Sequence, residues 1–82
     1  MNVRVQLDIT ADVCPITFVK TKLMLEKTPV GEIVAVRLRG AEPLENVPRS
    51  VRAHGHEVVS LTPEAPDQSG VTDPHILVIK RN

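Results

Sequence analysis

The chain has 82 residues, and its ten basic and ten acidic side chains leave no formal net charge at pH 7. Such a balance provides no overall positive electrostatic field to attract a polyanion. The single aromatic residue, Phe18, provides no platform for base stacking. Both features argue against direct nucleic-acid binding. No apolar run approaches the ~20 residues that span a bilayer, and no signal-peptide segment is evident. One cysteine cannot form an internal disulfide. We therefore expect a cytoplasmic protein without a membrane partner.

The first third of the chain changes from strand-like to helical periodicity. Apolar residues at every second position predict a strand from Val3 to Ile9. The spacing from Pro15 to Lys27 is helical, and Thr28-Pro29-Val30-Gly31 should end this helix. The apolar stripe expected to face the core comprises Ile16, Val19 and Leu23 with the flanking Phe18, Met24 and Leu25, whereas Lys20, Lys22, Glu26 and Lys27 should face water.

The rest of the chain contains three further strands and a second helix. The strands are expected at 32–39, 56–62 and 75–81, and the first of these is apolar enough for a central position. A helical pattern at 42–54 ends at Gly55, and Pro48 should delay its regular part to about residues 46–48. The connection at 63–74 should be exposed.

This order of elements, β-α-β-α-β-β, predicts a fold class. Strands separated by helices favour parallel pairing, whereas the last two strands can form a hairpin. We expect a single domain over residues 1–82, an α/β two-layer sandwich in which two helices cover one face of a four-stranded mixed sheet.

Cys14 is the strongest candidate for a reactive residue. Pro15 follows it, and proline is favoured at the first position of a helix, which would make Cys14 the N-cap. A sulfur there would lie near unpaired N–H groups and the positive end of the helix dipole, both of which favour a thiolate. This position favours a nucleophilic or sulfur-carrying cysteine over a buried structural one.

Other catalytic and metal-binding patterns are missing from the sequence. His54, His56 and His75 have no spacing that indicates a Cys–His dyad, and we interpret them as turn residues. The single cysteine and scattered histidines provide no paired metal ligands, and there is no phosphate-binding glycine loop. We expect neither a metal nor a cofactor.

Charged residues surround the candidate cysteine in the sequence. Asp8 and Asp12 bracket the preceding turn and should accept hydrogen bonds from its backbone; Asp12 could also tune access or partner choice, although its charge opposes a thiolate. Basic residues near the thiol would favour an anionic sulfur and an acidic partner. The basic set is Lys20, Lys22, Arg37, Arg39, Arg49 and Arg52.

These motifs together resemble the TusA/SirA-like family of sulfur carriers. The resemblance rests on Leu7-Asp8, Cys14-Pro15, Val30-Gly31-Glu32, Asn46-Val47-Pro48 and Gly55-His56-Glu57-Val58, and it covers nearly the whole chain. It implies the same two-layer α/β sandwich. Thr17 stands where the family has a second proline, and Arg39-Gly40-Ala41 stands where typical members have an acidic residue.

The resemblance also implies a sulfurtransferase-like role for Cys14. In this family the cysteine accepts a sulfane sulfur as a persulfide from a donor protein, such as a cysteine desulfurase or rhodanese, and passes it to an acceptor protein in tRNA thiolation, cofactor biosynthesis or sulfur metabolism. Pro15 would set the start of the helix, and Asp12, Lys20 and Lys22 would position the site or bind a partner. A non-catalytic interaction module on the same fold and a thiol redox sensor remain the alternatives.

Overall fold

The computed structural model describes residues 5–13 and 15–82, and it confirms the predicted order of elements. Val3 and Arg4, the first residues of the predicted first strand, lie outside the described residues, as does Cys14. The elements are β1 (Val5–Asp8), α1 (Ile16–Lys27), β2 (Ile33–Leu38), α2 (Ala41–Ala53), β3 (Glu57–Pro63) and β4 (His75–Lys80).

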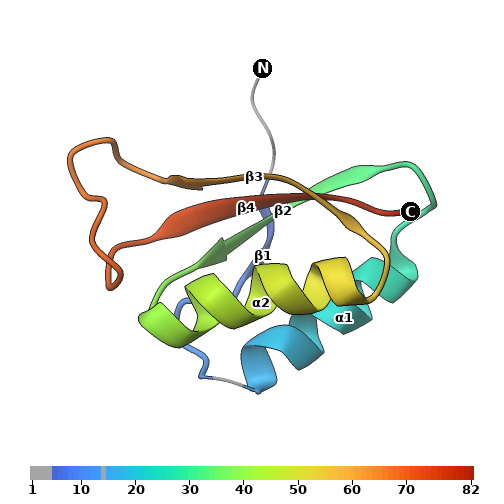
Figure 1. The fold of residues 1–82 in the computed structure, drawn as a ribbon, viewed down its shortest axis with the longest axis horizontal. Coiled ribbons are helices and arrows are strands. Elements are labelled where there is room, and N and C mark those ends of the chain that lie inside the picture. Colours follow the sequence, from blue (N-terminus) through green and yellow to red (C-terminus); the bar gives the residue numbers. More distant parts are fainter. Residues whose placement is uncertain (1–4, 14) are drawn as a thin grey trace.

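The four strands form one mixed sheet in the order β1-β2-β4-β3. β1 and β2 are parallel, whereas β4 is antiparallel to both β2 and β3. The central position of β2 and the antiparallel pairing of the last two strands agree with the sequence predictions. Both helices lie on one side of the sheet, which gives the predicted two-layer sandwich (Figure 1).

The core between the two layers is aliphatic. Alternate residues of the central strands point toward the helices, and both helices contribute side chains to the same cluster. Its buried members are Ile9, Leu25, Val34, Val36, Leu38, Val47, Val51, Leu77 and Ile79. This cluster holds the carboxyl ends of β1 and β2 in place, and the loops that leave them form the site described below.

The predicted buried stripe of α1 is wrong in three positions. Ile16, Val19 and Leu23 are 45–51% exposed, and the buried residues of the helix are instead Thr17, Thr21 and Leu25. The Thr21 hydroxyl donates a hydrogen bond to the Thr17 carbonyl oxygen at 2.8 Å, which satisfies its polar group inside the helix. Threonine can therefore occupy the core-facing positions here. The positions expected to face water do so: Lys20, Lys22, Glu26 and Lys27 are exposed.

The start of α2 also differs from the prediction. The helix begins at Ala41 rather than near residues 46–48. Pro43 lies in its first turn, where a missing N–H costs no helical hydrogen bond, and Pro48 lies inside the helix and is buried. Gly55 follows the C-cap residue His54 with a φ of 88°, as expected for the residue that ends the helix.

Candidate functional site

The loop between β1 and α1 is held in place by its own hydrogen bonds. Thr10 donates to the Asp8 carboxylate through its backbone N–H at 2.9 Å and its hydroxyl at 2.7 Å. These bonds lower the pKa of Asp8, the hydroxyl bond being the largest cause. The Asp12 N–H donates to the carbonyl oxygen of Ile9, and Ile9 is a completely buried residue. The loop that leads to position 14 is thus anchored to the core, and Asp8 has the turn-stabilising role that we expected.

The helix after this loop begins one residue later than the sequence suggests. α1 starts at Ile16 with Pro15 as its N-cap, so the expectation of Cys14 as the N-cap is wrong by one position. The Val13 carbonyl oxygen accepts the N–H groups of Ile16 at 2.9 Å and Thr17 at 3.3 Å. A tight turn on Val13 therefore precedes the regular helix. These two N–H groups, expected to be unpaired beside the sulfur, are already bonded to backbone.

Asp12 and Lys20 form the ion pair nearest to Cys14 in the sequence. The Lys20 Nζ lies 2.9 and 3.0 Å from the two carboxylate oxygens of Asp12. Asp12 side-chain atoms are 21% exposed and those of Lys20 are 47% exposed, so the pair is partly solvated and adds about 0–1 kcal/mol to stability. Its electrostatic effect is local: Lys20 offsets the carboxylate charge of Asp12.

Lys22, the other predicted basic site residue, lies away from this pair. It lines a smaller cavity of about 150 Å³ with Phe18, His54 and Arg81 among its other walls. The structure thus brings Asp12 together with Lys20 but not with Lys22.

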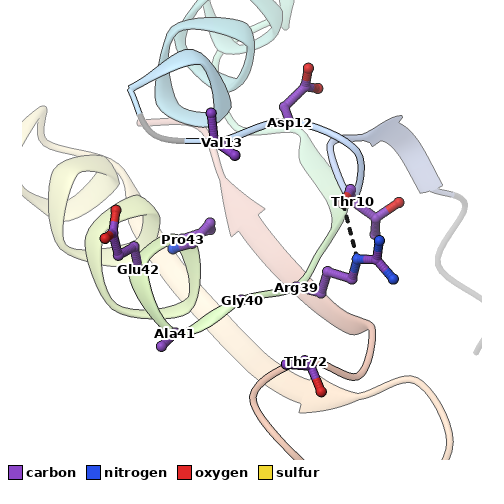
Figure 2. A pocket seen from close by; sticks show the side chains of 9 residues that line it. All are labelled: Thr10, Asp12, Val13, Arg39, Gly40, Ala41, Glu42, Pro43 and Thr72. Carbon is purple, nitrogen blue, oxygen red and sulfur yellow. Dashed lines mark hydrogen bonds between the residues drawn. The ribbon is translucent and has the colours of Figure 1, made fainter.

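A cleft that the sequence did not reveal lies beside the β1–α1 loop. It has a volume of about 800 Å³, and three segments form its walls (Figure 2). They are the β1–α1 loop with Thr10, Asp12 and Val13, the β2–α2 junction with Arg39, Gly40, Ala41, Glu42 and Pro43, and the β3–β4 loop with Thr72. Parallel neighbours β1 and β2 both end at this edge, which is where α/β sheets place ligand sites. Parallel pairing was thus the signal that could have located it.

Two interactions of the β2–α2 junction shape the cleft. The Arg39 Nε donates to the Thr10 carbonyl oxygen at 3.1 Å, which joins two walls (Figure 2). The Gly40 N–H donates to the Val71 carbonyl oxygen at 2.6 Å. This bond joins the β2–α2 junction to the β3–β4 loop, which forms the third wall of the cleft. Gly40 has a φ of 104°, a backbone conformation that side-chain-bearing residues rarely adopt, and a Cβ there would lie 3.3 Å from Pro43 Cδ.

The three histidines contact backbone groups, and two of these contacts are local; His75 is the first residue of β4 rather than a turn residue. The ring Nδ1 atoms of His54 and His75 lie 2.9 and 2.8 Å from the carbonyl oxygens of Ser50 and Asp73, and the His56 ring accepts the Asn82 N–H. His54 also packs on Phe18 with ring centroids 5.1 Å apart. In the described part of the chain no three His, Cys, Asp or Glu residues are grouped to bind a metal ion.

An exposed apolar stripe begins at the same loop. Val13 is 73% exposed, and Ile16, Val19 and Leu23 continue from it at helical spacing. We call these four residues the α1 stripe. Exposed apolar side chains that gather beside charged groups are typical of a surface that contacts another protein. Lys20 and Lys22 lie within the same stretch of α1.

Fold and site define a class of small α/β sandwich in which a cysteine-proline pair links the first strand to the first helix. Residues 5–80 match the model of a known protein family, which is described as "Sulfurtransferase TusA". The chain belongs to this family. Within residues 5–13 and 15–82, no helix has the length and apolar character to cross a membrane.

Three curated relatives carry the name "Putative sulfur carrier protein". The protein from Archaeoglobus fulgidus is 49% identical over 55 residues, which cover 67% of this chain and 62% of the relative, so the match spans less than two thirds of that protein. The protein from Thermotoga maritima is 34% identical over 62 residues, covering 76% of this chain and 78% of the relative. The Methanocaldococcus jannaschii protein is 39% identical over 54 residues, covering 66% of this chain and 72% of the relative.

Proposed function

We propose that this protein is a cytoplasmic sulfur carrier that accepts a sulfane sulfur on Cys14 as a persulfide and relays it to an acceptor protein. The observation that carries the proposal is the family match over residues 5–80 in a chain whose only thiol belongs to Cys14. The relatives from three organisms, all named as sulfur carriers, support it.

The transfer needs only a thiolate and a persulfide. The Cys14 thiolate attacks the outer sulfur of a donor persulfide, E–S–SH; a new S–S bond forms on Cys14, the S–S bond of the donor breaks, and the donor leaves as its thiolate. The product is Cys14–S–SH, with no net oxidation or reduction and no need for a general base. The positive end of the α1 dipole favours the anionic forms of both sulfur species.

The residues around Cys14 have supporting roles in this proposal. Pro15, the N-cap of α1, fixes where the helix begins. Lys20 neutralises Asp12, and the α1 stripe with Lys20 and Lys22 forms a docking surface for the donor or acceptor. A cysteine desulfurase or a rhodanese has the chemistry of the required donor.

Intact-protein mass spectrometry tests the proposal. The wild type and Cys14→Ser are incubated with a cysteine desulfurase and cysteine, or with a rhodanese and thiosulfate. We expect the wild type alone to gain the mass of sulfur, and a reductant to remove it.

Failure of the wild type to gain sulfur, with its thiol shown to be alkylatable, would contradict the carrier function and favour the interaction module. Trapping of a mixed disulfide with a partner under oxidants, without any persulfide, would favour the redox sensor.

A further inference from the structure

The cleft beside the β1–α1 loop has opposite charges on its two sides. Figure 2 shows Arg39 extending toward Thr10 on one side and Glu42 on the first turn of α2 on the other, with Val13 and Pro43 between them. An apolar centre with a cation at one end and an anion at the other can orient a bound group as well as hold it.

Arg39 is the cation of the cleft that is available to a ligand. Its Nε is used by the Thr10 carbonyl oxygen, which holds the guanidinium in place. Among residues 5–13 and 15–82, its two Nη atoms have no hydrogen bond or ion pair. The two NH₂ groups of such a guanidinium match the geometry of a carboxylate. Asp12, in contrast, is occupied by Lys20.

The lining favours a polypeptide segment over a small inorganic anion. The carboxylate of Glu42 would repel a free anion that fills the cleft, whereas a peptide can direct one carboxylate toward Arg39 and present a cationic or donor group to Glu42. The volume of about 800 Å³ accommodates several side chains, and Val13 and Pro43 provide apolar contact for them.

We infer that this cleft binds an acidic segment of the protein that exchanges sulfur with Cys14, with a carboxylate of that segment paired to Arg39. Thr10, Asp12 and Val13 line the cleft and directly precede Cys14 in the sequence, so a partner seated there is brought to the thiol. The inference rests on the proposed function, and it assigns Arg39 to partner specificity rather than to the chemical step.

The test compares sulfur loading from a protein with loading from a small molecule. The wild type, Arg39→Glu and Arg39→Lys are loaded by a persulfidated cysteine desulfurase or rhodanese and, separately, by inorganic polysulfide. Arg49→Glu is the matched control, because Arg49 is an exposed arginine of α2 that pairs with Glu45 and Asn46 and does not line the cleft. Thermal unfolding of each variant establishes that it is folded.

We expect Arg39→Glu to lower kcat/KM for loading from the protein donor by on the order of tenfold, mainly through KM, because a repulsive pair replaces an attractive one. Arg39→Lys should retain part of the activity, Arg49→Glu should resemble the wild type, and polysulfide loading should be the same in all four proteins. The wild-type rate should also fall more steeply with salt than that of Arg39→Glu.

Each possible failure has a separate meaning. If no donor loads the wild type, the proposed function is wrong. If protein donors load Arg39→Glu as fast as the wild type, the carrier function stands and the inference about the cleft is overturned. An equal loss of polysulfide loading in Arg39→Glu would also overturn it, because Arg39 would then act on the thiol. Faster protein-donor loading in Glu42→Lys would overturn the orientation proposed for the segment, because Glu42 would then repel the segment instead of pairing with a cationic or donor group on it.

Discussion

Arg37 links three segments of the chain through its guanidinium group. Its Nη1 lies 3.1 Å from Asp8, and its Nε and Nη2 lie 2.7 and 3.0 Å from the two oxygens of Glu64. The hydrogen bonds from Arg37 lower the pKa of Glu64, and those from Thr10, followed by Arg37, lower the pKa of Asp8. Both carboxylates are therefore more easily ionised in the folded protein than in the unfolded chain.

This network predicts a loss of stability in acid. The pKa values of Glu64 and Asp8 are lower in the folded protein than their ordinary values of 4.5 and 3.8, which apply to the unfolded chain. The resulting stabilisation is fully present above these unfolded values, and it is lost as the pH falls through the lower pKa values of the folded protein. The free energy of unfolding, measured by denaturant titration from pH 6 to pH 3, should fall more for the wild type than for Arg37→Gln. Arg49→Gln, which removes a solvated pair, should follow the wild type. If the free energy of unfolding fell by the same amount between pH 6 and pH 3 in all three proteins, the role of Arg37 would be refuted.

Individual site residues were predictable where the signal was local. Cys14-Pro15 is a motif of adjacent residues, and Asp8 bonds within two residues of itself, so both could be found from the sequence. The bond between Arg39 and Thr10 joins residues 29 positions apart. It depends on β1 and β2 being neighbours in the sheet, which no local pattern specifies.

The α1 helix shows how hydrophobicity alone can select the wrong face. Ile16, Val19 and Leu23 are the more apolar residues, but Thr17, Thr21 and Leu25 follow the same helical spacing one or two positions later and face the core. Hydrophobicity did not distinguish the core-facing side of α1 from the exposed side. A threonine hydroxyl can donate a hydrogen bond to a carbonyl oxygen of its own helix, and the threonine side chain can then pack in the core as an aliphatic residue does. The apolar residues left over form the α1 stripe.

Two leucines of α1 should therefore respond differently to truncation. Leu25 is 3% exposed, and Leu25→Ala should lower the free energy of unfolding by about 2–5 kcal/mol. Leu23 is 51% exposed, and Leu23→Ala should change it by no more than about 0.5 kcal/mol. Denaturant unfolding measures both. Loss of more stability in Leu23→Ala than in Leu25→Ala would contradict the assignment of the buried face.

At the scale of the whole molecule, Arg81 joins the sheet to the helical layer. It follows β4, and its Nη1 donates to the carbonyl oxygens of Leu25, Glu26 and Thr28 at 2.6, 3.2 and 2.7 Å. These carbonyls lie at the C-terminal end of α1, where helices present unpaired acceptors and partial negative charge. One side chain thus caps a helix 53–56 residues away in the sequence.

Removing this cap should destabilise the fold. Arg81→Ala should lower the free energy of unfolding by about 1–3 kcal/mol, because buried or partly buried carbonyl groups lose a charged donor. Lys27→Ala is the control, since Lys27 is an exposed cation in the same last turn of α1. Chemical unfolding at low salt measures the difference, and an equal loss in both variants would show that only the net charge matters.

The element order, the central position of β2 and the antiparallel pairing of the last two strands were predictable, whereas the complete strand order was not. Periods of two and 3.6 residues identify strands and helices, and they predict the order β-α-β-α-β-β. The position of β4 between β2 and β3 depends on pairing between residues more than 30 positions apart, such as Val36 and Leu77. The predicted α2 start was too late because Pro48 was expected to delay the regular helix, whereas the structure accommodates Pro48 inside the helix.

The hydrogen bond from Gly40 to Val71 has an evolutionary consequence. It connects the long β3–β4 loop to the β2–α2 junction, and Thr72 of that loop completes the cleft wall. Exposed loops accept insertions and deletions more readily than the elements they connect. Insertions or substitutions within residues 64–74 can therefore reshape one wall of the cleft without any change in the segment that carries Cys14.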